Sequence, residues 1–399
     1  MKVLRALRSP RIGLLRERAR RLRAIACGAG LLLAAGGAQA QSEGPAEREQ
    51  TRATMQKIFE SIRVLLPLSV NDDAFAAPEN RATVEQALAA LHDNADALAA
   101  HARTDDPARR YLGASLAADA RQALERYRAA HYDGAAFQIQ QTTENCVACH
   151  TKLRSPGDSP AAKHFVDRTA LAKRPLAERA RLEVATRQFA DAAKTYEKLL
   201  ASREIHPGEL LTPLSDYLIL EVRVRGEFDR ARKTLDAFAK RPDLWRNLRA
   251  DVVQWSRSLR ELAPLRDRPP DLAAARELIE KARQLQRYPA DRSSFVHYLV
   301  ASSLLQRYVE LPPPTDRDAA EAYYLLGLCE THVGDDYWVS QADLYLETAI
   351  RLAPKEPFAE EAYVLLEEET LVGYTGSGGP HLPESVAKHL EELRELIDD

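Results

Sequence analysis

The chain has 399 residues, of which 45% are hydrophobic and 29% charged, with a formal net charge of −3. This length exceeds what one small core can organise and predicts two or three domains, and the composition is typical of a soluble globular protein. The low glycine count of 17, beside abundant Ala, Leu, Arg and Glu, favours helices over sheets. We therefore expect an all-α fold.

The first 40 residues have the features of a signal peptide. An arginine-rich segment at 2–23 precedes an apolar stretch from Ala24 to Ala35, and Ala38-Gln39-Ala40 forms a small-x-small cleavage site before Gln41. The apolar stretch has about 12 residues, whereas a membrane-spanning helix needs roughly 20. Cleavage is therefore favoured over the alternative of an uncleaved anchor. We expect a periplasmic protein without a membrane span.

Removal of residues 1–40 changes the charge. They contain nine basic residues and one acidic residue, so the mature chain has 47 basic and 58 acidic residues and a net charge of −11. A nucleic-acid partner is excluded because it would need a basic face, whereas an acidic surface can steer a basic protein partner. Cys146, Cys149 and Cys329 remain. An odd count with one close pair indicates a use other than a disulfide for that pair.

Residues 47–155 are predicted to form four helices. Apolar residues recur at helical spacing over 55–66, 84–98, 112–127 and 137–153. We expect the first helix to end near Pro67, the third to begin at Asp105-Asp106-Pro107, and a short break at His131–Gly134 before the fourth. Mostly short connections favour an up-down-up-down bundle.

A stretch of turn-forming residues follows, and we assign residues 156–164 to a linker. Because helical patterns of different period lie on either side of it, the first block is expected to fold alone as residues 41–160.

Residues 165–399 are also predicted to be helical, with a weak repeat. An apolar residue, an alanine three positions later and an apolar residue four positions after that recur four times. The four sets are Phe189-Ala192-Tyr196, Phe228-Ala231-Leu235, Leu272-Ala275-Ile279 and Val339-Ala342-Leu346. Alanine at a helix crossing permits close approach, and such helix pairs stack into an α-solenoid. Chance similarity between amphipathic helices is the alternative.

One segment of this block resembles a tetratricopeptide repeat. Tyr323, Leu326 and Gly327 match the first helix of that motif, with Gly334 seven residues on, and Ala342, Leu346, Ala349, Leu352 and Pro354 match the second helix and its end. Three extra residues at 335–337 depart from the pattern, and the other repeats exceed the usual length of roughly 34 residues. The resemblance implies a degenerate helical-repeat array that offers a concave surface to a protein partner.

The motif with the clearest chemistry is Cys146-Val147-Ala148-Cys149-His150. Covalent haem attachment needs two thiols about one helical turn apart and an adjacent histidine that binds the iron, and C-x-x-C-H supplies all three. We therefore expect one haem c per chain, held by Cys146 and Cys149 and ligated by His150. A thioredoxin-like redox pair and half of a zinc site are the alternatives.

The end of a fourth helix with C-x-x-C-H, followed by His150-Thr151-Lys152-Leu153-Arg154, resembles the cytochrome c′ family. The resemblance covers residues 47–155 and implies a four-helix haem bundle with redox or gas-binding activity. It also implies pairing of two chains through their first helices. Leu153 departs from the usual aromatic residue, while Arg154 is kept and is a candidate for contact with the haem. A solvated cation at a helix end is the alternative for Arg154.

Met55 is the candidate sixth iron ligand, as the resemblance to low-spin members of that family implies. The start of helix one and the end of helix four lie at the same end of an up-down-up-down bundle, which brings Met55 towards His150. A core residue that fills a gap is the alternative. His92, His101 and His131 are weaker candidates and are expected at the surface or at helix caps.

Together these features predict a periplasmic mono-haem electron-transfer protein, not an enzyme, with one redox partner and a partner docked on the repeats. If Met55 does not bind, the alternative is a haem protein that binds NO or CO at an open iron position. A structural adaptor with a vestigial haem is a third reading. The glycine-rich segment 373–379 lacks the residues of a phosphate loop and is expected to be a turn, and Cys329 is expected to be a buried thiol.

Overall fold

The computed structural model describes residues 45–69, 72–101, 107–152, 157–158, 172–288, 291–311, 315–334, 341–377 and 379–398. The predicted signal peptide, Arg154, nearly all of the linker and the residues inserted at 335–337 lie outside these ranges. Within them the fold is all-α, as predicted, and the strands are limited to β1 (Thr375–Gly376) and β2 (Gly379–Pro380), which pair antiparallel. Within the same ranges, no helix is long and apolar enough to cross a membrane.

The first helical block, residues 45–152, contains the four predicted long helices. They are α2 (Pro45–Ser69), α4 (Arg81–His101), α5 (Pro107–Arg128) and α6 (Tyr132–His150), with the short α3 (Asp72–Ala76) after α2. Each long helix packs against the next, and α2 also packs against α6. The core of this block is built from the predicted apolar stripes of α2, α4 and α5 together with residues of α3 and α6.

Two predicted boundaries in this block were confirmed, and one was wrong. The first helix ends at Ser69, near Pro67 as expected, because a proline near a C-terminus removes one backbone hydrogen bond and leaves the last turn intact. The break before α6 lies at Ala129–His131, where Ala130 adopts φ 60°, and Gly134 is inside the helix. Helix α5 begins at Pro107 as predicted.

The short helix α3 was not predicted, and it closes the end of the block away from Cys146. Phe75 is fully buried, its ring lies edge-to-face with Tyr127 at 5.2 Å between centroids, and the Tyr127 hydroxyl donates to the Phe75 carbonyl oxygen. One isolated aromatic residue between two helices carries no periodicity, so the pattern analysis could not detect it.

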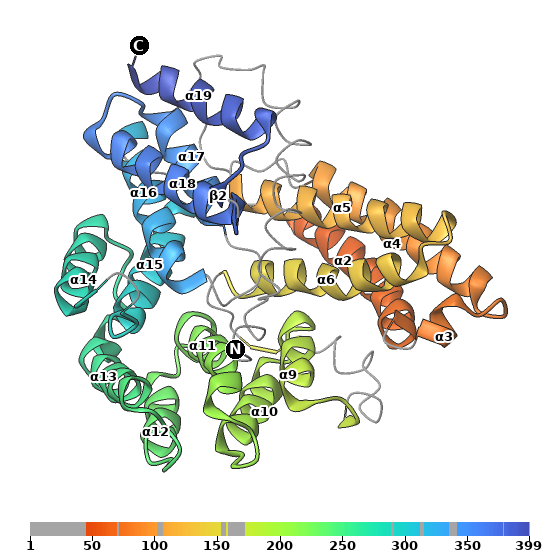
Figure 1. Ribbon diagram of the computed structural model, residues 1–399, viewed down its shortest axis with the longest axis horizontal. Coiled ribbons are helices and arrows are strands. Elements are labelled where there is room, and N and C mark those ends of the chain that lie inside the picture. The colour runs from red at the N-terminus through yellow and green to blue at the C-terminus, as the bar shows by residue number, and fades with distance from the viewer. Residues whose placement is uncertain are drawn as a thin grey trace.

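The second helical block, residues 172–398, is a chain of packed helices. Its elements are α9 (Leu176–Ala185), α10 (Phe189–Ala201), η1 (Pro207–Leu210), α11 (Leu211–Leu218), η2 (Ile219–Arg225), α12 (Phe228–Phe238), α13 (Arg246–Leu262), η3 (Ala263–Leu265), α14 (Leu272–Leu285), α15 (Phe295–Val309), α16 (Asp316–Val333), α17 (Ala342–Leu352), α18 (Pro357–Tyr374) and α19 (Glu384–Asp398). Helices adjacent in sequence pack in pairs, and the block curves round in Figure 1 from α9 to α19.

The predicted alanine positions lie at these helix contacts. Ala192, Ala231, Ala275 and Ala342 are buried, and Phe189, Phe228 and Leu272 are each the first residue of a helix. A Cβ added to Gly327 on α16 would lie 2.6 Å from the side chain of Leu346 on α17, so only glycine fits this crossing without a shift. Val339 of the fourth set lies outside the described residues.

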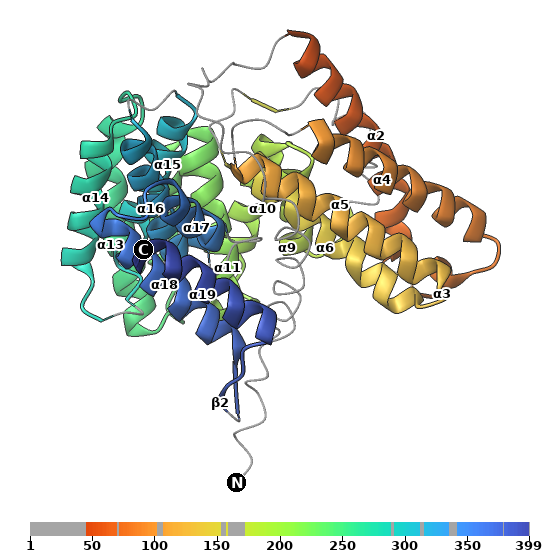
Figure 2. The same ribbon diagram turned by 90° about the horizontal axis from the view of Figure 1, so that it is seen from above.

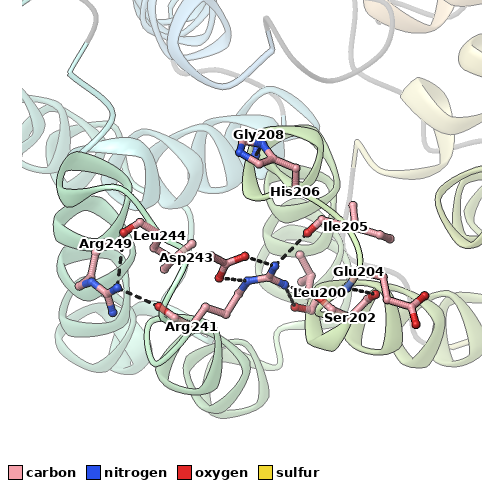
Figure 3. A network of polar contacts seen from close by, with 10 residues as sticks. All are labelled: Leu200, Ser202, Glu204, Ile205, His206, Gly208, Arg241, Asp243, Leu244 and Arg249. Carbon is pink, nitrogen blue, oxygen red and sulfur yellow. Dashed lines mark hydrogen bonds and ion pairs between the residues drawn. The ribbon is translucent and has the colours of Figure 1, made fainter.

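A buried arginine ties one helix pair to the next. Arg241, after α12, is 2% exposed and donates to the carbonyl oxygens of Leu200, Ser202 and Ile205 at the end of α10 (Figure 3). The Asp243 carboxylate neutralises its charge at 2.7 Å. A buried guanidinium is stable only when its donors are satisfied, which these partners achieve.

The end of the first block joins the hydrophobic core of the second. Ala108 and Leu112 of α5 and Val147 and Ala148 of α6 belong to the core of the second block. The end of the first block lies inside the curve of the second, where α6 packs against α9 and α5 against α17 (Figures 1 and 2). The end of the first block is therefore buried against the second, whereas its main core is built from its own helices. Independent folding of residues 41–160 stays a prediction.

Candidate functional site

The last turn of α6 carries Cys146, Cys149 and His150. The helix ends at His150, and Thr151 caps it with φ −101° and ψ 2° while its amide donates to the Val147 carbonyl oxygen. Both cysteines are free thiols. Cys146 is half-buried and Cys149 is exposed. Three residues of helix place the two sulfurs nearly one turn apart on the same side, the spacing that covalent haem attachment requires.

His150 is held by a residue of the second block. Its Nδ1 lies 2.9 Å from the backbone oxygen of Ala185, the last residue of α9. A carbonyl oxygen can only accept, so Nδ1 carries the proton and donates, and Nε2 keeps its lone pair. Burial, together with the smaller effect of the nearby Arg187 charge, lowers the pKa of His150 to about 4, although the Ala185 hydrogen bond acts in the opposite direction. The imidazole is therefore neutral near pH 7, the form that binds a metal.

The thiol chemistry does not match a thioredoxin-like pair. Burial raises the pKa of Cys146 to about 12, and the neighbouring Cys149 raises it as well. A thioredoxin-like pair needs a lowered thiol pKa, because the thiolate is the attacking species. As for a zinc site, no group of three or more His, Cys, Asp or Glu side chains in the described ranges is arranged to hold a metal ion.

Met55 lies on α2, partly buried and packed against the core of the first block. The Gln140 side chain donates to the backbone oxygen of Ser69, which sets the antiparallel alignment of α6 with α2. Counting 14 residues back along α2 and 10 forward along α6 from this pair leaves Met55 and His150 about 6 Å apart along the helix axes, at 1.5 Å per residue. This alignment places Met55 near the same end of the first block as His150, as the up-down-up-down topology predicts.

The N-terminal turns of α2 are loosely packed. Among its described side chains none before Ile58 is buried, and Figure 2 shows this part of α2 pointing away from the remaining helices. Packing therefore does not fix the position of Met55 firmly.

The other histidine candidates do not join His150. His92 on α4 lies beside Asp96, one turn on, with 3.7 Å between Nδ1 and a carboxylate oxygen. His131 is exposed and occupies the N-cap position of α6, in line with the expectation of a histidine at the surface or at a helix cap. The side chain of His101 and the whole of Arg154 lie outside the described residues.

A buried polar cluster beside the site was missed. Asp119 of α5 is fully buried and accepts hydrogen bonds from Gln138 at 2.8 Å and Asn145 at 2.6 Å, both on α6. Asn145 directly precedes Cys146. The signal was present in the sequence, because Asp119 falls on the stripe formed by Leu112, Leu116 and Ala123, where an acidic residue must be buried and bonded.

Two further expectations were confirmed. Cys329 is fully buried on α16. The glycine-rich segment 373–379 contains the tight turn between β1 and β2, and Gly379 there has φ 93°.

The residues fit the haem that the motif implies. Two free thiols and a neutral imidazole with Nε2 available stand on one turn of α6.

Comparison of the chain with protein-family models, with curated proteins and with solved structures finds no match.

Proposed function

We propose that this protein is an exported, periplasmic mono-haem c-type cytochrome that transfers electrons. It comprises a cytochrome c′-like four-helix bundle followed by a tetratricopeptide-like α-solenoid. The observation that carries this proposal is the C-x-x-C-H turn at the end of α6, with both thiols free and the His150 Nδ1 bonded to the Ala185 oxygen at 2.9 Å. Haem c, when bound, supplies a one-electron couple between ferric and ferrous iron.

Each residue of the turn has its own role in this proposal. Cys146 and Cys149 would hold the haem through thioether bonds, and His150 would bind the iron through Nε2. Met55 would supply a thioether ligand, which raises the reduction potential. Arg154 is proposed to contact the haem edge. Partial burial of His150 favours its neutral form.

The second block provides protein docking in this account. The end of the first block packs against α9 and α17 of the second block. The helical-repeat block therefore already binds the cytochrome bundle of its own chain. A separate docked protein and a redox protein are the external partners, and the net charge of −11 favours a basic redox partner. Pairing of two chains through the exposed side of α2 is the proposed homodimer contact.

A gas-binding protein is the second candidate function. The N-terminal turns of α2 favour it, because none of their described side chains before Ile58 is fully buried and Met55 is only partly covered by the core. If Met55 does not bind the iron, the sixth coordination position would be open to NO or CO.

The absorption spectrum of the purified full-length protein tests both candidates. A low-spin spectrum with a thioether-to-iron charge-transfer band supports electron transfer. A high-spin ferrous spectrum that shifts on addition of CO supports gas binding. A colourless protein after expression with a c-type haem attachment system would refute both.

A further inference from the structure

Two turns of the second block have the same backbone conformation but differ in the amino acid at the position with positive φ. Gln188 before α10 and Glu227 before α12 both adopt φ −94° and ψ 57°. The residue that precedes each has a positive φ, 69° at Gly226 and 56° at Arg187. Glycine enters this left-handed region freely, whereas the Cβ of arginine is crowded there. Arg187 therefore stands where the corresponding turn uses glycine.

The strained turn is the one that meets His150. The Ala185 oxygen, two residues before Arg187, accepts the His150 Nδ1 proton at 2.9 Å. Arg187 belongs to the same turn, two residues beyond the oxygen that holds the imidazole. Strained backbone persists only where the surrounding structure imposes it, and such positions are concentrated at functional sites.

Packing fixes this turn against α6. Val147 and Ala148 of α6 share a hydrophobic core with Ala180 and Val184 of α9, all at most 6% exposed. Just beyond α6, the Lys152 side chain is 4% exposed, and its Nζ lies 3.7 Å from a carboxylate oxygen of Glu310, the residue after α15.

The Glu310 carboxylate also pairs with Arg109 of α5 at 3.0 Å. The turn and His150 are thus parts of one packed unit formed by both blocks.

We propose that the α9–α10 turn is a positioning element of the haem site, through which the helical-repeat block sets the reduction potential. The proposal rests on the proposed function. The Ala185 oxygen fixes the ring and tautomer of His150 and increases its strength as a ligand. Uptake of one electron from a one-electron donor protein adds one negative charge to the site. The Arg187 guanidinium stabilises that charge, so it raises the potential.

Hydrogen exchange in the two oxidation states of the haem-loaded full-length protein tests the coupling. Because coupling between two sites is reciprocal, a change of charge at the iron must alter the opening of the turn that holds His150. Amides at 183–189 should change protection between the ferric and ferrous states, while amides at 222–228 in the matched turn should not. Equal protection of both turns in both states would overturn the coupling.

Variants at the two turns test the charge. Arg187→Asn keeps a residue that tolerates positive φ but removes the cation, so the potential should fall. Arg187→Lys keeps the positive charge, so its reduction potential should stay close to that of the wild type. The matched control Gly226→Asn should leave the potential unchanged. If Arg187→Asn alters thermal stability and leaves the potential at the wild-type value, Arg187 has only a structural role and the inference fails. A wild-type protein without haem would instead refute the proposed function.

Discussion

His150, the last residue of α6, donates a hydrogen bond from Nδ1 to the backbone oxygen of Ala185, the last residue of α9, over 2.9 Å. The two residues belong to different helical blocks, and the predicted linker lies between them in sequence. A hydrogen bond to this nitrogen decides which ring nitrogen is available to a metal. The second block is therefore part of the immediate surroundings of the C-x-x-C-H turn.

Replacement of both site cysteines should abolish haem attachment. The double variant Cys146→Ser with Cys149→Ser removes the thiols that are spaced for thioether bonds, whereas Cys329 is buried in α16. A denaturing gel stained for haem should show no signal for the double variant. The control Cys329→Ser should stain as the wild type does, and staining of the double variant would contradict the proposed anchors.

Met55→Ala should leave the haem attached but change the ligation of its iron. Loss of the thioether removes the ligand that favours ferrous iron, so the reduction potential should fall, the spectrum should become high-spin, and CO should bind more tightly. Val64→Ala, another partly buried position on α2, is the matched control and should change none of these. If Met55→Ala also changes none of them, Met55 is only a packing residue, and gas binding becomes the favoured function.

Gly327→Ala should destabilise the second block. The new Cβ would lie 2.6 Å from two Leu346 side-chain atoms and 3.3 Å from its backbone nitrogen, so the α16–α17 crossing must open. Overpacking of this kind typically costs about 1–3 kcal/mol in the free energy of unfolding, measurable by denaturant titration. Gly376→Ala has free space around its Cβ and is the control. Addition of Leu346→Ala should recover part of the loss, and a fully additive double variant would argue against the close contact.

Glu310→Gln should weaken the junction between the blocks. The change removes the carboxylate charge that lies 3.7 Å from the buried Lys152 ammonium and 3.0 Å from the Arg109 guanidinium. Glutamine keeps an oxygen that can accept but carries no charge, so we expect a loss of about 1 kcal/mol in the free energy of unfolding, the difference between a charge-assisted and a neutral hydrogen bond. Because four residues of the first block belong to the core of the second, unfolding should remain a single transition with coincident haem and helix signals. Two separate transitions in the wild type would show that the blocks are independent. Glu204→Gln, at an exposed position, is the control.

Docking of α19 on α17 should depend on pH through His389 and Glu347, whose side chains lie 3.2 Å apart. The hydrogen bond to Glu347 raises the pKa of His389, and the same bond helps to lower the pKa of Glu347 against its burial. The histidine contribution is complete below its unfolded pKa of about 6.5 and is lost as the pH rises through its folded pKa. The glutamate contribution is present above about 4.3 and is lost on acidification below it.

Stability of α19 should therefore be greatest near pH 5–6, by roughly 0.5–1 kcal/mol for a partly exposed pair. Hydrogen exchange of α19 amides between pH 5.5 and 8 measures this. His389→Gln should flatten the profile, and an unchanged slope would assign the pH dependence to other groups.

Periodic patterns in the sequence predicted the helices and several of the contacts between them. Apolar residues on one side of each helix identified the four long helices of the first block, and Ala192 and Ala231 marked helix contacts, because burial on a helix leaves a periodic pattern. Residues that meet across the two blocks leave no such pattern. The Ala185 oxygen is a backbone atom, and the Lys152–Glu310 pair joins positions far apart in sequence. The left-handed conformation of Arg187 could not be predicted, since the residue type argues against it.

Peptide mass analysis of the purified full-length protein is the most direct test of the haem proposal. After expression with a c-type haem attachment system and proteolysis, the peptide that contains Cys146, Cys149 and His150 should carry the added mass of one haem. The peptide that contains Cys329 should be unmodified. A Cys146–Cys149 peptide with two free thiols, or with a disulfide and no haem, would contradict the account.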